Sequence, residues 1–279
     1  MNSGTDRRPR ARWIAGLLAF AGLCLTAGGA VGQAATGVSD PAQFVPLDQI
    51  TPGQRANVAE VIRDHTFHRK GTPETFPCNA KVYLCLLNEP PLTLALWKDL
   101  SDSAVQLKPV GPNRYEGTDG NGATASWEFV LRSPKMHVLL CNLSYTSPRG
   151  TAHLDARIVL VVHSGFYREV NGEPWVQHDV EAFVKVDSKG WKVVARTLRP
   201  VIEKLLEDQV REAGYFVSLM GRLVATYPNW ACQVTMKQAE IAADVRQRFR
   251  DIVLQTRRPG AFTGRPALVD NLDPSVRSR

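Results

Sequence analysis

The chain has 279 residues, of which 44% are hydrophobic, and a formal net charge of +7. The charge is unevenly placed: residues 1–35 and the segment from residue 256 onward carry +3 each, which leaves +1 for the body between them. A nucleic-acid binder needs a basic surface on its folded part, so this distribution argues against nucleic acid as a partner. The body is long enough for one large domain with a substantial core, with or without an appendage.

Residues 1–35 have the pattern of an export signal. Four arginines between positions 7 and 12 precede the apolar stretch Trp13–Leu25 and a run of small residues. This stretch is shorter than the ~20 apolar residues of a transmembrane helix. We therefore expect cleavage after Ala30, Ala34 or Ala35 and an exported protein, periplasmic or extracellular, that does not span a membrane. Residues 36–50 are expected to form a linker.

Four cysteines lie outside the signal, at Cys78, Cys85, Cys141 and Cys232. In an exported protein they could form one or two disulfides, with three connectivities for the full set. Free cysteine is equally common as a small buried hydrophobe, so both states stay open.

The first helix is predicted from Pro52 to about His65. Thr51 is the expected N-cap, and Gln54 stands at the reciprocal position of a capping box. Residues 66–76 are expected to be extended.

Two short helices come next. Asn79 can cap the first, in which the apolar side chains share one face, and Pro91 can begin the second, which runs to Leu100. From there the apolar period changes from helical to two, which predicts strands. The expected strands lie near residues 104–110, 113–118, 123–132, 137–145, 158–166 and 176–186.

Strand parity assigns an inner face. Trp127 and Phe129 share the apolar face of their strand, and the same alternation selects Leu139 and Cys141 on the next. Residues 158–166 are apolar on both faces, which places that strand at the centre of the sheet. The pair Asn171-Gly172 predicts a hairpin with a type I′ turn.

A long helix is predicted from Pro200 to Tyr227, where apolar residues recur every three or four positions. It would be ~40 Å long at 1.5 Å per residue. Pro228 ends it, and another amphipathic helix is expected near 235–255. Residues 256–279 are expected to be a disordered basic tail.

This order of elements resembles the helix-grip fold of the START-like and polyketide-cyclase-like (SRPBCC) superfamily over residues 66–227. The local similarity lies in Glu74–Asn79, followed by Val82–Leu87 and then Trp97. The resemblance implies an α+β fold in which a curved antiparallel sheet wraps a long C-terminal helix, here with extra helices at both ends. The domain would span 51–227, with a helical extension over 228–255.

Members of that superfamily mostly hold lipids, sterols or other apolar molecules between sheet and helix, and a minority catalyse cyclisation or ring chemistry. The resemblance transfers no catalytic residue. Parity and the helix stripe together select the candidate ligand-lining residues Trp127, Phe129, Leu139, Cys141, His178, Val180, Phe216 and Met220. The aromatic rings of Tyr145 and Phe183 are also expected in the space between sheet and helix.

His178 is the polar member of this set. A buried neutral imidazole needs a hydrogen-bond partner, which the protein or a ligand could supply. His137 carries the same argument on its own strand. His65 and His68 have a His-x-x-His spacing without a third ligand nearby, so we expect no metal site, and no cofactor motif appears in the sequence.

Three functions are therefore expected, in this order. The first is an exported, non-catalytic protein that binds an apolar small molecule or lipid. The second is an interaction or structural protein with a filled core, acting through its C-terminal extension. The third is a cyclase- or hydrolase-type enzyme that uses His178 with a nearby carboxylate.

Overall fold

The computed structural model describes residues 40–101, 103–120, 122–146, 150, 153–187, 199–257 and 261–266, with the side chains of 199–209 and 212 left out. The expected signal and most of the expected tail lie outside these residues. No helix in the described part of the chain is both long and apolar enough to cross a membrane.

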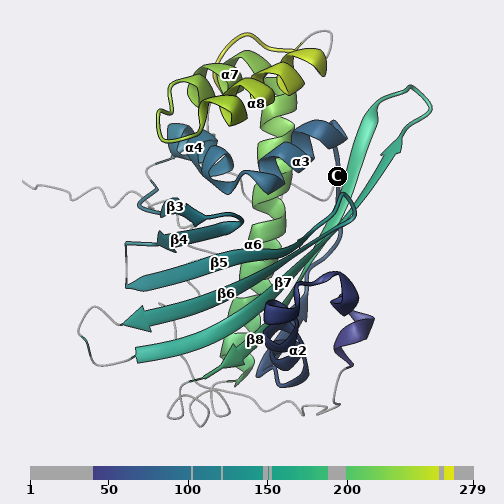
Figure 1. Ribbon diagram of the computed structural model, residues 1–279. Helices are drawn as coiled ribbons and strands as arrows, with labels where there is room; N and C mark the ends of the chain where they lie inside the picture. Colours follow the sequence, from purple (N-terminus) through teal and green to yellow (C-terminus); the bar gives the residue numbers. More distant parts are fainter. Residues whose placement is uncertain are drawn as a thin grey trace, which may run out of the picture.

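One curved, antiparallel sheet of eight strands dominates the molecule (Figure 1). Its order is β1-β8-β7-β6-β5-β4-β3, and β2 also pairs with β8. The strands are β1 (Phe67–Lys70), β2 (Glu74–Pro77), β3 (Gln106–Gly111), β4 (Arg114–Thr118), β5 (Ala123–Arg132), β6 (Met136–Thr146), β7 (His153–Arg168) and β8 (Pro174–Val186). All of the strands expected from the period of two are present.

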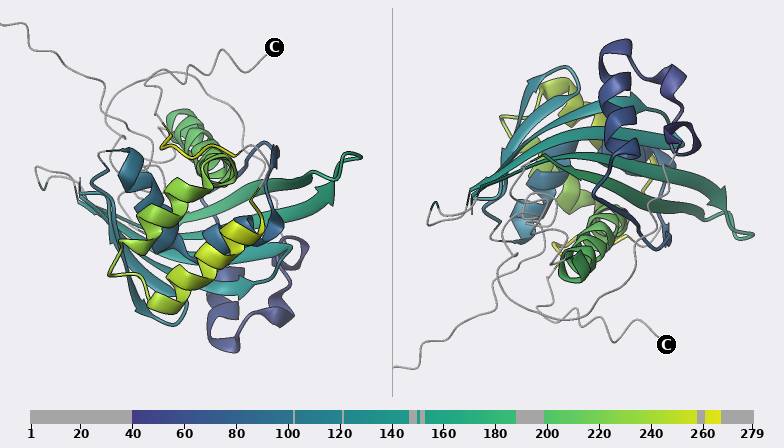
Figure 2. Two further views of the ribbon diagram at one scale, coloured as in Figure 1. Left: turned by 90° about the horizontal axis from the view of Figure 1, so that it is seen from above. Right: turned by 90° about the horizontal axis from the view of Figure 1, so that it is seen from below.

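Helices cover both faces of this sheet. They are α2 (Pro52–Arg63), α3 (Ala80–Asn88), α4 (Pro90–Leu100), α6 (Arg199–Thr226), α7 (Pro228–Met236) and α8 (Ala243–Gln255). The long α6 lies against one face and α2 against the opposite face (Figure 2). We call the face toward α6 the inner face and the face toward α2 the outer face. Two short helices between β2 and β3, and a long helix after the last strand, make this a helix-grip fold, as the resemblance implies.

The central strand β7 is buried on both faces, as its sequence predicts. Ile158 and Leu160 face inward, whereas Val159 and Val161 pack beneath α2 on the outer face. Both faces of β7 must be apolar because both are covered: the outer face by α2 and the segment that precedes it, and the inner face by the helical layer.

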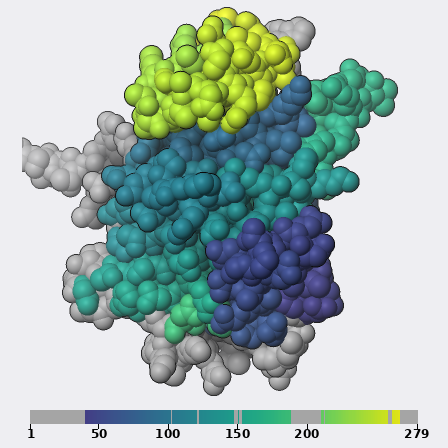
Figure 3. All heavy atoms as spheres, in the orientation of Figure 1, coloured from purple at the N-terminus to yellow at the C-terminus, as the bar shows by residue number. Residues whose placement is uncertain are grey.

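The part of the expected linker that the structure describes, residues 40–50, is packed rather than free. It forms the short 3₁₀ helices η2 (Pro41–Gln43) and η3 (Leu47–Gln49). Val45 and Ile50 are buried in the same outer-face cluster as α2. In the space-filling view this N-terminal segment lies on the sheet, and α7 and α8 lie at the opposite end (Figure 3).

The β7–β8 hairpin forms where Asn171-Gly172 predicts it, but the turn type differs. Only Gly172 has a positive φ, 81°, whereas type I′ needs positive φ at both central residues. The Gly172 amide donates to the carbonyl of Glu169 at 2.8 Å. The Asn171 side chain accepts a hydrogen bond from the Glu173 amide at 2.8 Å and so caps the turn locally. The Asn171 backbone does not adopt the left-handed conformation.

Two further expectations are corrected. Phe183 lies on the outer face, stacked on His68 at 4.4 Å, because it alternates with the inward-facing Ala182 and Val184. The capping box at Thr51 does not form: Thr51 makes no side-chain cap, and Gln54 instead donates to Glu128 on β5 at 2.8 Å.

The C-terminal region contains two helices where the sequence predicts one. Pro228 ends α6 and at once begins α7, because proline fits the first turn of a helix, where no amide donor is needed. The next helix, α8, begins only at Ala243 rather than near residue 235.

Cys85, Cys141 and Cys232 are free thiols. Cys78, Cys85 and Cys141 are buried, and burial raises the pKa of Cys85 to about 11. For Cys85 and Cys141 the structure therefore selects the second of the two states left open by the sequence, in which cysteine acts as a small core residue.

Candidate functional site

The inner face of the sheet carries an apolar surface over β5, β6, β7 and β8. Five of the eight predicted lining residues meet there in one cluster. These are Trp127, Phe129, Leu139, Cys141 and Val180. Val210 of α6 and Leu94 of α4 belong to the same cluster and face them from the helical side.

The side chains at the centre of the sheet differ in how closely helices cover them. Under α2, Val159 and Val161 are 0% exposed. On the inner face the neighbouring side chains keep some accessibility: Trp127 is 9% exposed and Leu160 8%. Leu139, although it points inward from the middle of β6, is only half-buried. Around Leu139 the helical layer therefore leaves apolar surface accessible, whereas α2 leaves none at Val159 and Val161.

The position of α6 explains the difference. It packs chiefly on β1, β2 and β8, at one side of the sheet, rather than over β5 to β7. Gly221 lets its backbone approach β2 closely, since an added Cβ would lie 3.0 Å from the Phe76 ring and 3.2 Å from the Cys78 sulfur. Docking at that side leaves the surface around Leu139 less closely covered.

The structure does not bring the two predicted helix residues onto this surface. Phe216 and Met220 belong to a second cluster, formed by α6 with α3, α4, α7 and α8. The Phe216 ring meets Trp97 of α4 edge-on at 5.7 Å, and Met220 is fully buried. The stripe along α6 thus serves two different packing partners, which its periodicity alone could not reveal.

His178 lies where β8 passes α3 and α6, and it is 2% exposed. Its Nδ1 lies 3.2 Å from the Tyr83 hydroxyl, which in turn lies 2.9 Å from the Ser164 hydroxyl. Nε2 is buried and has no hydrogen-bond partner. It faces Gly214 of α6, where an added Cβ would lie 3.7 Å away.

Burial lowers the pKa of His178 to about 4, so the imidazole is neutral at pH 7. The Gly214 backbone opposes this shift, although it forms no hydrogen bond of good geometry with Nε2, and the charge of Arg222 adds to it. No described carboxylate hydrogen-bonds His178. Glu74 is its Cα partner on β2, but the Glu74 carboxylate accepts from Ser218 instead.

A second polar group stands where β5 turns into β6. His137 is 1% exposed, its Nε2 lies 3.1 Å from the Asn88 side-chain oxygen, and its Nδ1 is buried without a partner. Burial, with the nearby charge of Arg132 as a second cause, lowers the pKa of His137 to about 4. Arg132 lies over the Phe129 ring at 3.9 Å. Sequence alternation did not select Arg132, because it assigns that residue to the outer face.

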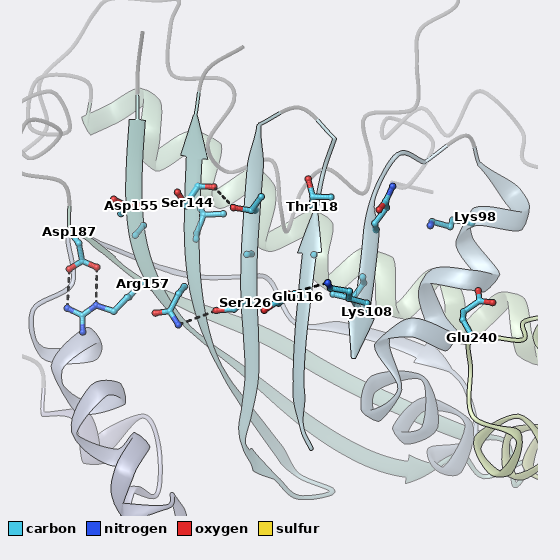
Figure 4. A pocket seen from close by; sticks show the side chains of 18 residues that line it. Lys98, Lys108, Glu116, Thr118, Ser126, Ser144, Asp155, Arg157, Asp187 and Glu240 are labelled. Atoms are coloured by element: carbon cyan, nitrogen blue, oxygen red, sulfur yellow. Dashed lines mark hydrogen bonds and ion pairs between the residues drawn. The ribbon is translucent and has the colours of Figure 1, made fainter. Parts of the chain in front are cut away.

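The outer face carries a polar hollow of about 930 Å³ across β3 to β7 (Figure 4). Short polar side chains project into it from neighbouring strands, Ser126 and Ser144 among them. Charged residues within it pair with one another: Lys108 with Glu116 at 3.6 Å, and Arg157 with Asp187 at 3.0 Å. None of the eight predicted lining residues borders this hollow.

No group of three or more His, Cys, Asp or Glu side chains in the described part of the chain could hold a metal ion. His65 and His68 are engaged separately. The first bonds the Ile62 carbonyl at 2.7 Å, and the second bonds the Glu181 carboxylate at 2.7 Å.

No protein-family model and no curated protein matches the chain. Solved structures that match include a conserved protein from Geobacillus kaustophilus, at 17% identity and a TM-score of 0.37, over 55% of this chain and 96% of that chain. Another is the Zhui aromatase/cyclase from a Streptomyces species, at 10% identity and a TM-score of 0.32, over 57% and 94%. Ara h 8.0201 matches at 14% identity and a TM-score of 0.28, over 52% and 97%. Likenesses this low carry no weight for function, and the fold assignment rests on the strand order and on α6.

Proposed function

We propose that this protein binds an apolar small molecule or lipid between the inner face of β5–β8 and the helical layer, without catalysing a reaction on it. The observation that carries the proposal is the accessible apolar surface around Leu139 on the inner face. Val159 and Val161 are sealed under α2, whereas Leu139 and Leu160 keep accessible surface on the inner face. Apolar surface that the protein itself covers incompletely is what an apolar ligand would gain by burying.

The buried polar atoms support the same proposal. A buried imidazole nitrogen without a partner is costly, and His178 Nε2 and His137 Nδ1 are both in that state. A polar group on the ligand would satisfy either one. His178 bonds Tyr83 rather than a carboxylate, so the pairing on which a general-base mechanism would depend is not formed.

The export signal predicted in residues 1–35 supports a place outside the cytoplasm, where a binding protein would carry or store its ligand. This part of the proposal depends on the sequence pattern alone, since those residues lie outside the described structure.

The C-terminal extension fits the binding role better than an independent interaction module. Trp230 of α7 and Phe249 of α8 are buried in the cluster that also contains Met220. The Trp230 indole donates to the Asp99 carboxylate of α4 at 2.8 Å. Removing this extension would open the second cluster, so truncation would test folding rather than partner binding.

A direct test is lipid extraction from the full-length protein, expressed with its own leader, followed by mass spectrometry and by titration with the neutral fluorophore N-phenyl-1-naphthylamine. We expect a co-purifying apolar compound and saturable fluorophore binding. Leu139→Trp should fill the space at the centre of the inner face and weaken fluorophore binding by about tenfold or more.

Thr124→Trp is the matched control, because it adds the same side chain to an exposed position on the outer face of the neighbouring strand. Circular dichroism would show that both variants are folded. The proposal fails if the wild-type protein binds neither lipid nor fluorophore, or if Leu139→Trp binds like Thr124→Trp. Turnover of a bound compound that His178→Gln abolishes would support an enzyme instead.

A further inference from the structure

A β-bulge in β5 turns Arg132 onto the inner face. The pairing of β5 with β6 shifts between Phe129 and Leu131. Val130 and Leu131 consequently both pack in the outer-face cluster, and Arg132 faces inward as the Cα partner of His137. Bulges re-aim the side chains that follow them. Regular alternation from Phe129 would have placed Arg132 on the outer face.

Arg132 has no carboxylate partner in the described part of the chain. Its guanidinium lies 3.9 Å above the Phe129 ring, and its Nη2 reaches the Tyr115 hydroxyl at 3.4 Å, a long hydrogen bond. Its Nε is buried without any partner. The acidic group that acts on it from the helical side is Glu89, but Glu89 is bonded to Arg248 at 2.6 Å.

This arrangement leaves a cation short of a counter-ion. A guanidinium stays charged at all relevant pH values, and burying part of it without an anion or hydrogen-bond acceptor costs free energy. His137 stands directly across from it with a second unpartnered nitrogen, and that side chain is 1% exposed. Two neighbouring, unsatisfied polar groups therefore border the apolar surface at its β5–β6 end.

We propose that Arg132 forms a carboxylate subsite beside His137, with its guanidinium donating to the ligand carboxylate, so that the ligand is an apolar acid whose chain runs over Phe129 and Leu139. The inference rests on the proposed function and names its ligand class. Phe129 and Leu139 are Cα partners on the inner face, next to the Arg132–His137 pair along the same two strands. A single guanidinium matches a monoanion, whereas a phosphate monoester, with close to two charges, would need a second cation.

The test compares four ligands of one chain length by displacement of N-phenyl-1-naphthylamine: dodecanoic acid, its methyl ester, dodecanol and dodecyl phosphate. The wild-type protein is expected to bind the acid about tenfold or more tightly than the ester or the alcohol, through charge-assisted hydrogen bonds. Arg132→Met keeps an unbranched stem over Phe129 but removes the charge, so the acid should fall to within about twofold of the ester.

Arg114→Met is the control, because Arg114 is an exposed arginine on the neighbouring strand β4. Arg132→Lys keeps the charge and should retain most of the preference, which guards against a folding defect in Arg132→Met. The inference is overturned if the wild type prefers the ester or the phosphate, or if Arg132→Met keeps the preference for the acid. In those outcomes the neutral fluorophore still binds and the proposed function stands. If acid, ester and fluorophore all fail to bind, the proposed function itself fails.

Discussion

Tyr83 on α3 and His178 on β8 are joined by a hydrogen bond of 3.2 Å, although they lie 95 positions apart in the chain. The same Tyr83 hydroxyl meets Ser164 on β7 at 2.9 Å. One phenol therefore ties a short helix to both strands of the long β7–β8 hairpin, at the place where α6 also passes. Ser164 and His178 each have Tyr83 as the partner of this hydrogen bond.

Replacing this phenol tests how much the network contributes to stability. We expect Tyr83→Phe to lower the free energy of unfolding by about 1–3 kcal/mol, because Ser164 Oγ and His178 Nδ1 would lose a partner while buried. Urea unfolding followed by tryptophan fluorescence would measure the change. Tyr167→Phe, at a 44% exposed tyrosine on β7, should stay within about 0.5 kcal/mol of the wild type. Equal losses in the two variants would contradict the role given to Tyr83.

The two buried imidazoles should make stability depend on pH below neutrality. Burial lowers the pKa values of His137 and His178 to about 4, below the usual value near 6.5. As the pH falls, the unfolded chain therefore takes up protons on these imidazoles before the folded protein does. The free energy of unfolding is thus unaffected by them above pH 6.5 and declines as the pH falls from 6.5 toward 4.

Each imidazole should account for about 2 kcal/mol of lost stability between pH 7.5 and 5. Urea unfolding at several pH values measures it. We expect His178→Gln to be less stable than the wild type at every pH. Its loss of stability between pH 7.5 and 5 should, however, be smaller than that of the wild type by the contribution of one imidazole. An identical decline in both proteins would show that His178 is not buried as a neutral group.

Glu60 holds α2 against the outer face through ion pairs with Arg157 at 2.9 Å and Lys185 at 2.5 Å. Its hydrogen bonds with Arg157 and then Lys185 lower its pKa to about 2. Because the folded-state pKa lies below the usual value, this stabilisation is present above about pH 4.5 and is lost as the pH falls toward 2.

We expect Glu60→Gln to cost about 1 kcal/mol at pH 7, since its carboxylate is 40% exposed and screened by solvent. The difference from the wild type should shrink as the pH falls below 4.5, in unfolding curves measured at pH 7 and pH 3. Glu116→Gln is the control, because Glu116 makes one exposed pair with Lys108 at 3.6 Å. A cost for Glu60→Gln no larger than that for Glu116→Gln would refute a structural role for the network.

Two glycines of α6 form a natural comparison. Alanine is favoured over glycine inside a helix by about 1 kcal/mol. At Gly214 an added Cβ would meet His178 and Val180 at 3.7 Å, an ordinary contact, so Gly214→Ala should be stabilising. At Gly221 the same Cβ would press against Phe76 at 3.0 Å and Cys78 at 3.2 Å, so Gly221→Ala should gain less or lose stability. Thermal unfolding of the pair measures the difference, and the opposite order would mean that α6 does not pack closely on β2.

Local patterns in the sequence account for much of this structure. Strands and helices follow from periods of two and about 3.6, because those periods state which side chains one element can bury together. The parity of β5, β6 and β8 correctly placed Trp127, Cys141 and Val180 on one surface. Asn79 caps its helix as predicted, since a cap involves only neighbours in the chain.

Features that depend on contacts between distant segments could not be predicted in this way. The period of α6 identifies an apolar stripe, but docking beside β2 divides that stripe between two clusters and separates Phe216 and Met220 from Trp127. The bulge before Arg132 reverses strand parity by one residue, and alternation cannot foresee an inserted residue.

The sequence by itself therefore determined the order of elements, the inner face of the strands and an expected export signal, because each depends on residues close together in the chain. Only the tertiary structure decided that Arg132 faces inward beside His137, that Tyr83 is the partner of His178, and that apolar surface around Leu139 stays accessible. Those outcomes depend on how helices and strands meet across long sequence distances, where small shifts in register or docking change which side chains share a space.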